Sequence, residues 1–114
     1  MRVISQARLR QFWEQAGRAE AAGPLRAWYT HVGNKTVAWQ SWADLKSDFA
    51  TASSVGNCIV FNIGGNKYRL VVRVLYRSQK VFILKVMTHG EYDSEKWKTE
   101  CGCYEPPPRQ QKRN

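Results

Sequence analysis

The chain has 114 residues, of which 43% are hydrophobic and 24% are charged. These values are typical of a folded domain, and the length excludes a two-domain enzyme with a separate cofactor lobe. Eighteen Lys and Arg against nine Asp and Glu give a net charge of +9, which favours a polyanionic partner, most often nucleic acid.

Membrane, secretion and metal signals are weak in this sequence. No run approaches the ~18 apolar residues of a membrane span, and the first residues lack the apolar stretch of a secretory signal. We therefore expect a cytoplasmic protein with no membrane partner. The three cysteines (Cys58, Cys101 and Cys103) cannot all pair within one chain, so we expect no disulfide framework. Only two histidines could complete a zinc site of four ligands, and we expect neither a metal nor a cofactor.

The first half of the chain predicts mainly helices. Leu9, Phe12 and Trp13 recur at helical spacing, as do the large apolar residues between positions 25 and 32, and such stripes are typical of a buried helix face. Ser5 is suited to cap the first helix, and Pro24 is an alternative first position of the second. In chain order we expect a strand over residues 2–4, helices over 5–17 and 19–32, a strand over 36–39, a helix over 41–49 and a loop over 50–57.

From Cys58 onwards the apolar period changes to two, which predicts strands. The Gly64-Gly65 pair indicates a two-residue turn, which would place Phe61 opposite Tyr68 and both apolar faces on one side of the sheet. In chain order we expect strands over residues 58–63, 67–77 and 81–87 and a short helix over 91–97.

Helices followed by a meander of strands predict an α+β fold, with the N-terminal helices on one face of a small, mostly antiparallel sheet. We expect a single domain over residues 1–98. The Pro-rich, basic segment over residues 99–114 is predicted to be disordered.

The basic residues gather in the strand region. The segment from Cys58 to His89 holds six Lys and Arg residues and no acidic residue, whereas a merely solvated surface usually mixes both signs. Alternation places Arg69, Arg73 and Arg77 on one face of their strand, and guanidinium groups bind phosphate oxygens in pairs. The residues expected to bind RNA are Asn66, Lys67, Arg69, Arg73, Arg77 and Lys80.

A second cluster of polar residues follows the last strand. Histidine is the side chain best suited to proton transfer near neutral pH, so His89 could transfer protons, and Tyr92 lies close to it in the sequence. Cleavage of RNA needs a base, an acid and cations that stabilise the charge on phosphorus. We expect His89, Tyr92, Arg73 and Lys85 to carry this chemistry, with the assignment of acid and base left open. The two-residue turn would place Lys85 on the core face, so either the turn is looser or Lys85 lies at the sheet edge.

Two segments, residues 60–69 (VFNIGGNKYR) and residues 88–93 (THGEYD), resemble the HigB-type toxins of bacterial type II toxin–antitoxin systems. The similarity extends from about Val3 to Trp97. Gly90 departs from the pattern, since the family commonly has Ala or Lys there, and the tail has no counterpart. The positions that match the family motifs are Asn62, Gly65, Asn66, Arg69, His89, Glu91, Tyr92 and Asp93.

The resemblance implies a RelE-like fold and an endonuclease that cuts mRNA, often on the ribosome, and so inhibits translation. It also implies a cognate helix-turn-helix antitoxin of the HigA type, through which the toxin reaches operator DNA. The activity expected from these residues is that of a metal-independent endoribonuclease. The alternative is a non-catalytic RNA-binding module that uses the same basic face; a third possibility is an interaction domain for an acidic protein.

Overall fold

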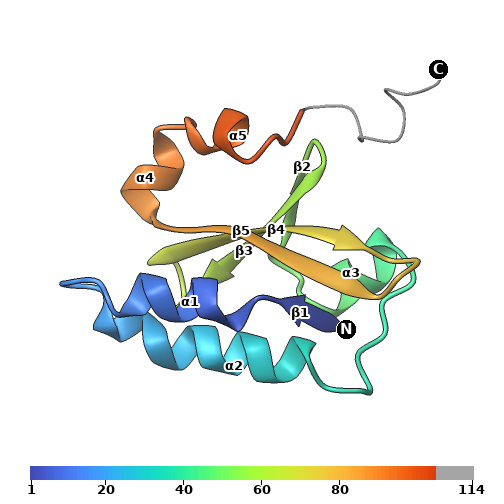
Figure 1. Ribbon diagram of the computed structural model, residues 1–114. Coiled ribbons are helices and arrows are strands. Elements are labelled where there is room, and N and C mark those ends of the chain that lie inside the picture. Colours follow the sequence, from blue (N-terminus) through green and yellow to red (C-terminus); the bar gives the residue numbers. More distant parts are fainter. Residues whose placement is uncertain (105–114) are drawn as a thin grey trace.

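The computed structural model describes residues 1–104 and forms one mixed sheet with helices on both faces (Figure 1). The strand order is β1-β5-β4-β3-β2, with β1 parallel to β5 and every other pair antiparallel. The α+β prediction is confirmed. Within residues 1–104, no helix is long and apolar enough to cross a bilayer. The elements are β1 (Arg2–Ile4), α1 (Gln6–Trp13), the 3-10 turn η1 (Ala19–Ala21), α2 (Ala22–Val32), α3 (Trp42–Asp48), β2 (Ser53–Val55), β3 (Cys58–Ile63), β4 (Tyr68–Leu75), β5 (Lys80–Thr88), α4 (His89–Asp93) and α5 (Trp97–Glu100).

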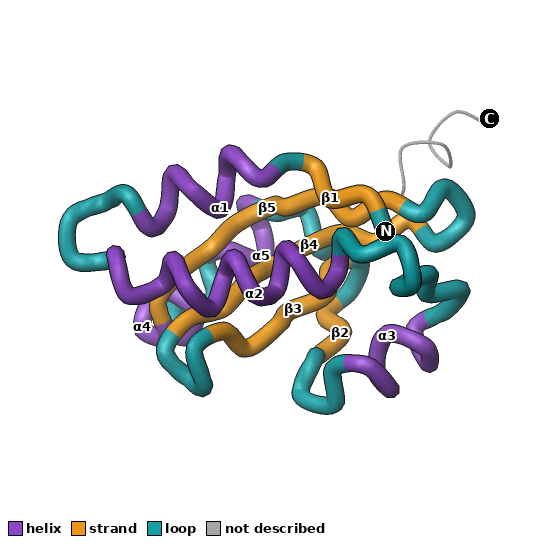
Figure 2. Tube along the Cα trace, turned by 90° about the horizontal axis from the view of Figure 1, so that it is seen from below, coloured by secondary structure: helices purple, strands orange, loops and turns teal. Residues whose placement is uncertain are grey.

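The main core lies between the N-terminal helices and one face of the sheet (Figure 2). As the helical spacing predicts, α1 buries Leu9, Phe12 and Trp13. Helix α2 buries a second stripe that includes Trp28, whose ring meets Phe61 of β3 edge to face at 5.4 Å. The apolar stripes thus act as scaffold and fix the orientation of both helices.

The hairpin between β3 and β4 has a longer turn than the sequence predicted. Ile63 pairs with Tyr68, so Phe61 lies opposite Leu70 and the turn contains four residues rather than two. The predicted register is therefore wrong by two residues. Since side chains alternate with a period of two, this shift leaves the same residues on the core face, and the assignment of faces is confirmed.

Several element boundaries also differ from the predictions. Helix α1 ends at Trp13, four residues before Gly17. Residues 36–39 form no strand, because Trp39 packs into the core from an irregular segment. The expected loop over 50–57 contains the edge strand β2. Helix α3 begins as predicted, with the Ser41 hydroxyl accepting the N–H of Asp44 at 3.4 Å.

The second face of the sheet is covered by the C-terminal segment, which the sequence did not predict. Trp97 is 1% exposed and packs with Val60, Val71 and Met87 in a separate small core. The packed chain continues to residue 103, beyond residue 98, where we expect the domain to end. Residues 105–114 of the expected tail lie outside the described residues.

Cys58 and Cys103 form a disulfide, so the expectation of no disulfide is wrong. Their Cα atoms lie 5.1 Å apart although 45 positions separate them in the sequence. The segment over residues 96–104, which we call the C-terminal strap, thus returns to the start of β3. Cys101 keeps a free thiol, and burial raises the pKa of this thiol.

Candidate functional site

The arginines of β4 do not form the open cationic face that the alternating pattern predicted. Arg69 is only 7% exposed, and its guanidinium donates to the carbonyl oxygens of Asn66 at 3.2 Å and Tyr68 at 3.1 Å. It also donates to the Asn66 Oδ1 at 3.1 Å and lies 5.1 Å from the centre of the Tyr92 ring. Arg69 therefore links the turn between β3 and β4 to Tyr92 of α4, the helix that follows β5. The alternating pattern predicted the correct face for Arg69, but it did not show that a later segment of the chain would cover this residue.

Arg73 lies on the same face, half-buried beneath the C-terminal strap. Its Nη2 donates to the carbonyl oxygen of Gly102 at 3.1 Å. Its Nε is buried and has no hydrogen-bond partner within residues 1–104, and no carboxylate of that range pairs with its guanidinium. One buried nitrogen of this half-buried cation is therefore unsatisfied, which is uncommon in folded proteins.

The other residues expected to bind RNA are divided between the two ends of β4. Asn66 and Lys67 belong to the hairpin turn before the strand, where Lys67 pairs with Glu20 at 2.9 Å. This contact raises the pKa of the Lys67 amine, chiefly through the hydrogen bond to Glu20. Arg77 and Lys80 follow the strand at its other end. The structure therefore does not bring the six predicted residues together on one surface.

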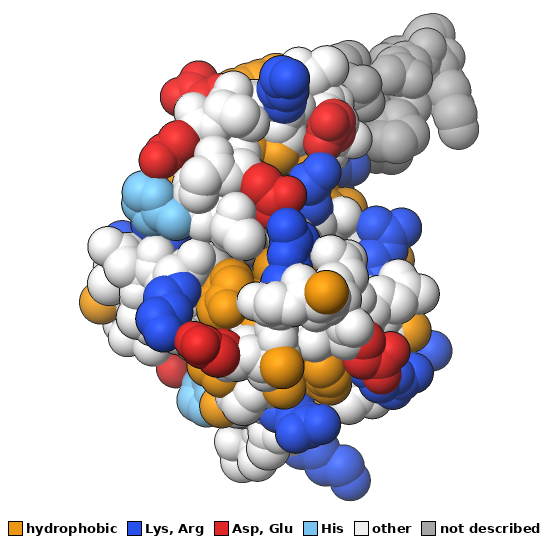
Figure 3. Space-filling view, turned by 90° about the vertical axis from the view of Figure 1, so that its left-hand side faces the viewer, with side chains coloured by type: hydrophobic (Ala, Val, Ile, Leu, Met, Phe, Trp, Pro, Cys, Tyr) orange, Lys and Arg blue, Asp and Glu red, His pale blue; other side chains and the backbone are white. Residues whose placement is uncertain are grey.

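Basic side chains do meet in a groove of about 470 Å³ beside β5. Strand β1 pairs only with Lys80–Phe82, so the second half of β5 lies next to α1 instead of another strand. Lys85 is opposite Val71, on the face of Arg73, because a bulge shifts the pairing of β4 with β5. Arg8 and Arg18 complete the groove from the other side. Figure 3 shows this side of the molecule, where Lys and Arg side chains gather in a hollow next to acidic ones.

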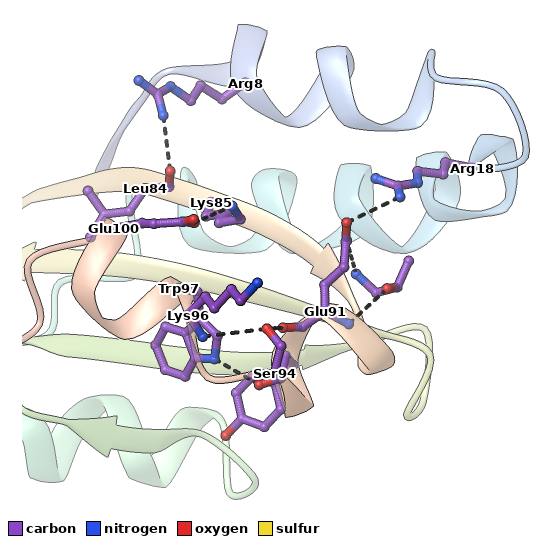
Figure 4. Close-up of polar contacts among 11 residues, drawn as sticks. Arg8, Arg18, Leu84, Lys85, Glu91, Ser94, Lys96, Trp97 and Glu100 are labelled. Atoms are coloured by element: carbon purple, nitrogen blue, oxygen red, sulfur yellow. Dashed lines mark hydrogen bonds and ion pairs between the residues drawn. The ribbon is translucent and has the colours of Figure 1, made fainter.

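Each cation of the groove has a partner that a phosphate could replace (Figure 4). The Arg8 Nη1 donates to the Leu84 carbonyl oxygen at 3.0 Å, and the Lys85 Nζ lies 2.7 Å from a Glu100 oxygen. The contact with Glu100 raises the pKa of the Lys85 amine, mainly through its hydrogen bond, so Lys85 is charged at neutral pH. Arg18 lies 3.4 Å from Glu91. These ion pairs are partly solvated and hence weak.

Helix α4 begins next to the groove and is fixed by a complete capping box. The Thr88 hydroxyl accepts the N–H of Glu91 at 3.2 Å, and the Glu91 carboxylate accepts the N–H of Thr88 at 2.9 Å. The backbone hydrogen bond from Thr88 is the main reason why the pKa of Glu91 is lowered. Such a reciprocal cap defines where the helix starts, and it therefore fixes the position of the neighbouring His89.

His89 is a half-exposed residue with one ring nitrogen engaged. Its Nδ1 lies 3.1 Å from the Asp93 carboxylate, one helical turn away, and 49% of the side chain is exposed. Its backbone N–H donates to the Lys67 carbonyl oxygen at 3.1 Å, which ties α4 to the hairpin turn. The Asp93 carboxylate lies at ion-pair distance from Nδ1, so Nε2 is the ring nitrogen left to exchange a proton with a ligand.

Tyr92 is more constrained than the sequence suggested. Its ring stacks on Trp97, with 5.2 Å between ring centres and 17° between planes, and it also meets the Arg69 guanidinium. The Tyr92 carbonyl oxygen accepts the indole N–H of Trp97 at 2.9 Å. Tyr92 thus links α4 to the C-terminal strap and to the buried arginine.

Sequence reasoning missed Arg8 and Arg18, because Arg8 lies on a helix assigned to scaffold and Arg18 lies in the short segment between the two expected helices. A signal was present: Arg8, Gln11, Gln15 and Arg18 recur three or four positions apart, and all four line the groove. Of the predicted catalytic residues, Lys85 lies in the groove, His89 and Tyr92 lie on the adjoining helix, and Arg73 lies under the strap. Within residues 1–104, no three His, Cys, Asp or Glu side chains cluster as metal ligands would.

Comparison with known proteins gives two findings. Residues 21–95 match the family model described as HigB toxin, RelE-like toxic component of a toxin-antitoxin system. A stretch of 34 residues is 59% identical to the mRNA interferase toxin HigB of Escherichia coli strain K12 and to the mRNA interferase HigB of Escherichia coli O157:H7. This stretch covers 30% of the chain and 33% of each relative, so the chain matches about a third of the length of these curated relatives.

Proposed function

Since the chain belongs to the HigB family of RelE-like toxic components of toxin–antitoxin systems, we propose that it is an endoribonuclease that cuts mRNA and so inhibits translation and growth. The observation that carries this proposal is the basic groove between α1 and β5, which is also lined by Glu91 of α4, the helix on which His89 lies beside the Asp93 carboxylate. The relatives that match part of the chain are named mRNA interferases, which agrees with this reading of the groove.

The proposed reaction needs only proton transfer and charge stabilisation. A base removes the proton of a ribose 2′-hydroxyl, the oxygen attacks the adjacent phosphorus, and the 5′-oxygen leaves with a proton from an acid. His89 performs one of these transfers through Nε2, and Asp93 stabilises the charged imidazole. The cations of Lys85, Arg8 and Arg18 exchange their present partners for phosphate oxygens and stabilise the negative charge that builds up on phosphorus. In this proposal no metal ion is required.

Tyr92 has a positioning role in this proposal. Its ring is fixed by Trp97 and Arg69, so the helix that carries His89 keeps its orientation when RNA enters the groove. The exposed Lys67 of the hairpin turn, which is bonded to His89 through the backbone, extends the phosphate-binding surface beyond the imidazole.

The same proposal includes partners and cellular location. A toxin of this family needs an antitoxin, and we propose a helix-turn-helix protein of the HigA type that carries the complex to operator DNA. The substrate is mRNA in the cytoplasm, bound on the ribosome.

The test uses the two histidines of the chain as a matched pair. On induction, wild type and His31→Ala are expected to arrest growth and to create new 5′ ends in mRNA, detected by primer extension. His31 is the control because it pairs with Asp48 on the α2–α3 side of the fold. His89→Ala is expected to lose 10²- to 10⁴-fold in cleavage rate, the usual contribution of a general acid or base, while keeping its melting temperature.

Two outcomes would contradict the proposal. If His89→Ala cuts as well as wild type, the imidazole is not catalytic. If wild type binds RNA with a strong salt dependence but produces no new 5′ ends, the chain is the RNA-binding module considered as the alternative.

A further inference from the structure

The C-terminal strap is fixed to the sheet at two places of different kinds. Trp97, at its start, is buried among apolar residues, whereas its far end is fixed by the Cys58–Cys103 disulfide. Cys58 and Cys103 are both fully buried. The family match ends at residue 95, so the strap lies beyond it. One anchor therefore depends on packing, and the other depends on a bond that a reductant can break.

The far end of the strap lies close against the edge of the sheet. The Cys103 carbonyl oxygen accepts the N–H of Asn57. Gly56, with a φ of +56°, leaves no room there for a β-carbon, which would collide with the Cys103 backbone. The turn before β3 thus fits the strap end closely while the disulfide is intact.

Two residues of the strap contact cations on the sheet face that the strap covers. The Gly102 carbonyl oxygen accepts a hydrogen bond from Arg73, and the Glu100 carboxylate pairs with Lys85. These contacts leave one hydrogen-bond donor of this face unsatisfied, because the Arg73 Nε is buried and has no partner in the described residues. A guanidinium in such surroundings would gain hydrogen bonds from a phosphate or from water if the strap moved away.

We propose that the Cys58–Cys103 disulfide is a redox latch that keeps the end of the strap on Arg73 and Lys85, and that its reduction opens this surface to the phosphates of RNA. The inference rests on the proposed function, because it concerns the regulation of the same groove. Trp97 keeps the start of the strap in place in both states. The movement is therefore limited to the strap residues after Trp97, which include Glu100 and Gly102.

The chemistry of opening is a thiol–disulfide exchange with a dithiol, either a small molecule or a protein. One thiolate of the dithiol attacks a sulfur of the disulfide and forms a mixed disulfide, and one cysteine leaves as a thiolate. The second thiol of the dithiol then displaces the other cysteine. Two electrons and two protons pass to Cys58 and Cys103, which become thiols, and the dithiol becomes a disulfide.

The experiment measures RNA binding rather than cleavage, on the full chain. The probe is a fluorescent single-stranded oligonucleotide with 2′-O-methyl riboses, which lacks the nucleophile of the proposed reaction. Binding is followed by fluorescence anisotropy at several salt concentrations, before and after treatment with dithiothreitol. Mass spectrometry after alkylation records the state of each cysteine.

Reduction is expected to tighten binding about tenfold near 0.1 M salt. It should also steepen the dependence of log affinity on log salt by about 1.4, the value for two additional phosphate contacts in a single strand. Cys103→Ser should bind like the reduced chain without any reductant, and Cys101→Ser should respond to dithiothreitol like wild type. Reduced Arg73→Gln should lose about half of the additional salt dependence.

Equal affinity and equal salt dependence in the two redox states would overturn the latch, as would alkylation of Cys58 and Cys103 in the oxidised chain. Reduced wild type keeps the test decisive if Cys103→Ser does not fold. The outcome is separable from that of the proposed function. Binding that responds to reduction without any cleavage of natural RNA refutes the nuclease and supports the latch, whereas equal cleavage in both states supports the nuclease and refutes the latch.

Discussion

Breaking the disulfide should lower the stability of the fold by an amount that follows from its place in the chain. The perturbation is the double variant Cys58→Ala/Cys103→Ala, or reduction of the wild type. The cross-link joins residues 45 positions apart. It therefore restricts a long loop in the unfolded chain, and most of its contribution is expected to come from that restriction rather than from new contacts in the folded state.

The magnitude can be worked from the loop length. A closed loop of 45 residues reduces the entropy of the unfolded chain by about 13 cal/mol/K, which corresponds to about 4 kcal/mol at 25 °C. Unfolding of a domain gains about 2.1 cal/mol/K per residue near its midpoint. For 114 residues the loss of the cross-link therefore lowers the melting temperature by roughly 15–20 °C.

The assay is thermal unfolding followed by circular dichroism, with and without dithiothreitol. Cys101→Ala is the matched control, because Cys101 lies outside the disulfide and its removal leaves the loop closed. The control should melt near wild type and show the same response to reductant. Oxidised and reduced wild type that melt within about 3 °C of each other would refute the reasoning, since a loop of this length cannot be opened at so small a loss.

Other consequences concern the groove, α4 and the strap. Arg8→Ala should weaken RNA binding and reduce the salt dependence by about 0.7, the value for one phosphate contact, whereas Arg10→Ala, an exposed residue on the same helix, should change neither. The lowered pKa of Glu91 means that its cap stabilises the fold above the pKa of the unfolded chain. This contribution is lost as the pH falls through the lower folded value, so Glu91→Gln should show a smaller drop in melting temperature between pH 5 and pH 3. Trp97→Ala should cost about 3–5 kcal/mol in urea unfolding, and a loss below 1 kcal/mol would contradict its place in the second core. Asp93→Asn should slow RNA cleavage about tenfold or more by removing the partner of the imidazole, and an unchanged rate would show that this ion pair is not used.

Local periodicity determined the faces of the elements. The helical spacing of Leu9, Phe12 and Trp13 predicted the buried side of α1, and alternation around Phe61 predicted the core side of the hairpin. The assignment for the hairpin holds although the register is wrong, because side chains alternate with a period of two and a shift of two residues keeps each one on the same face. The motif around His89 likewise indicated the family before any fold was known.

The candidate site depended on contacts that no local pattern contains. Arg8 meets the carbonyl oxygen of Leu84 across 76 positions of the sequence, and Cys58 meets Cys103 across 45. Alternation correctly placed Arg73 on the face away from the main core, but it gave no sign that the C-terminal strap would cover that face.

The sequence by itself determined which side chains face the core, the class of the fold and the family to which the chain belongs. Only the tertiary structure decided which cations remain accessible, where the groove lies and which cysteines pair. The physical reason is that periodicity reports the environment of a single element, whereas a groove or a cross-link requires the path that the chain takes between elements, and that path is set by packing over the whole domain.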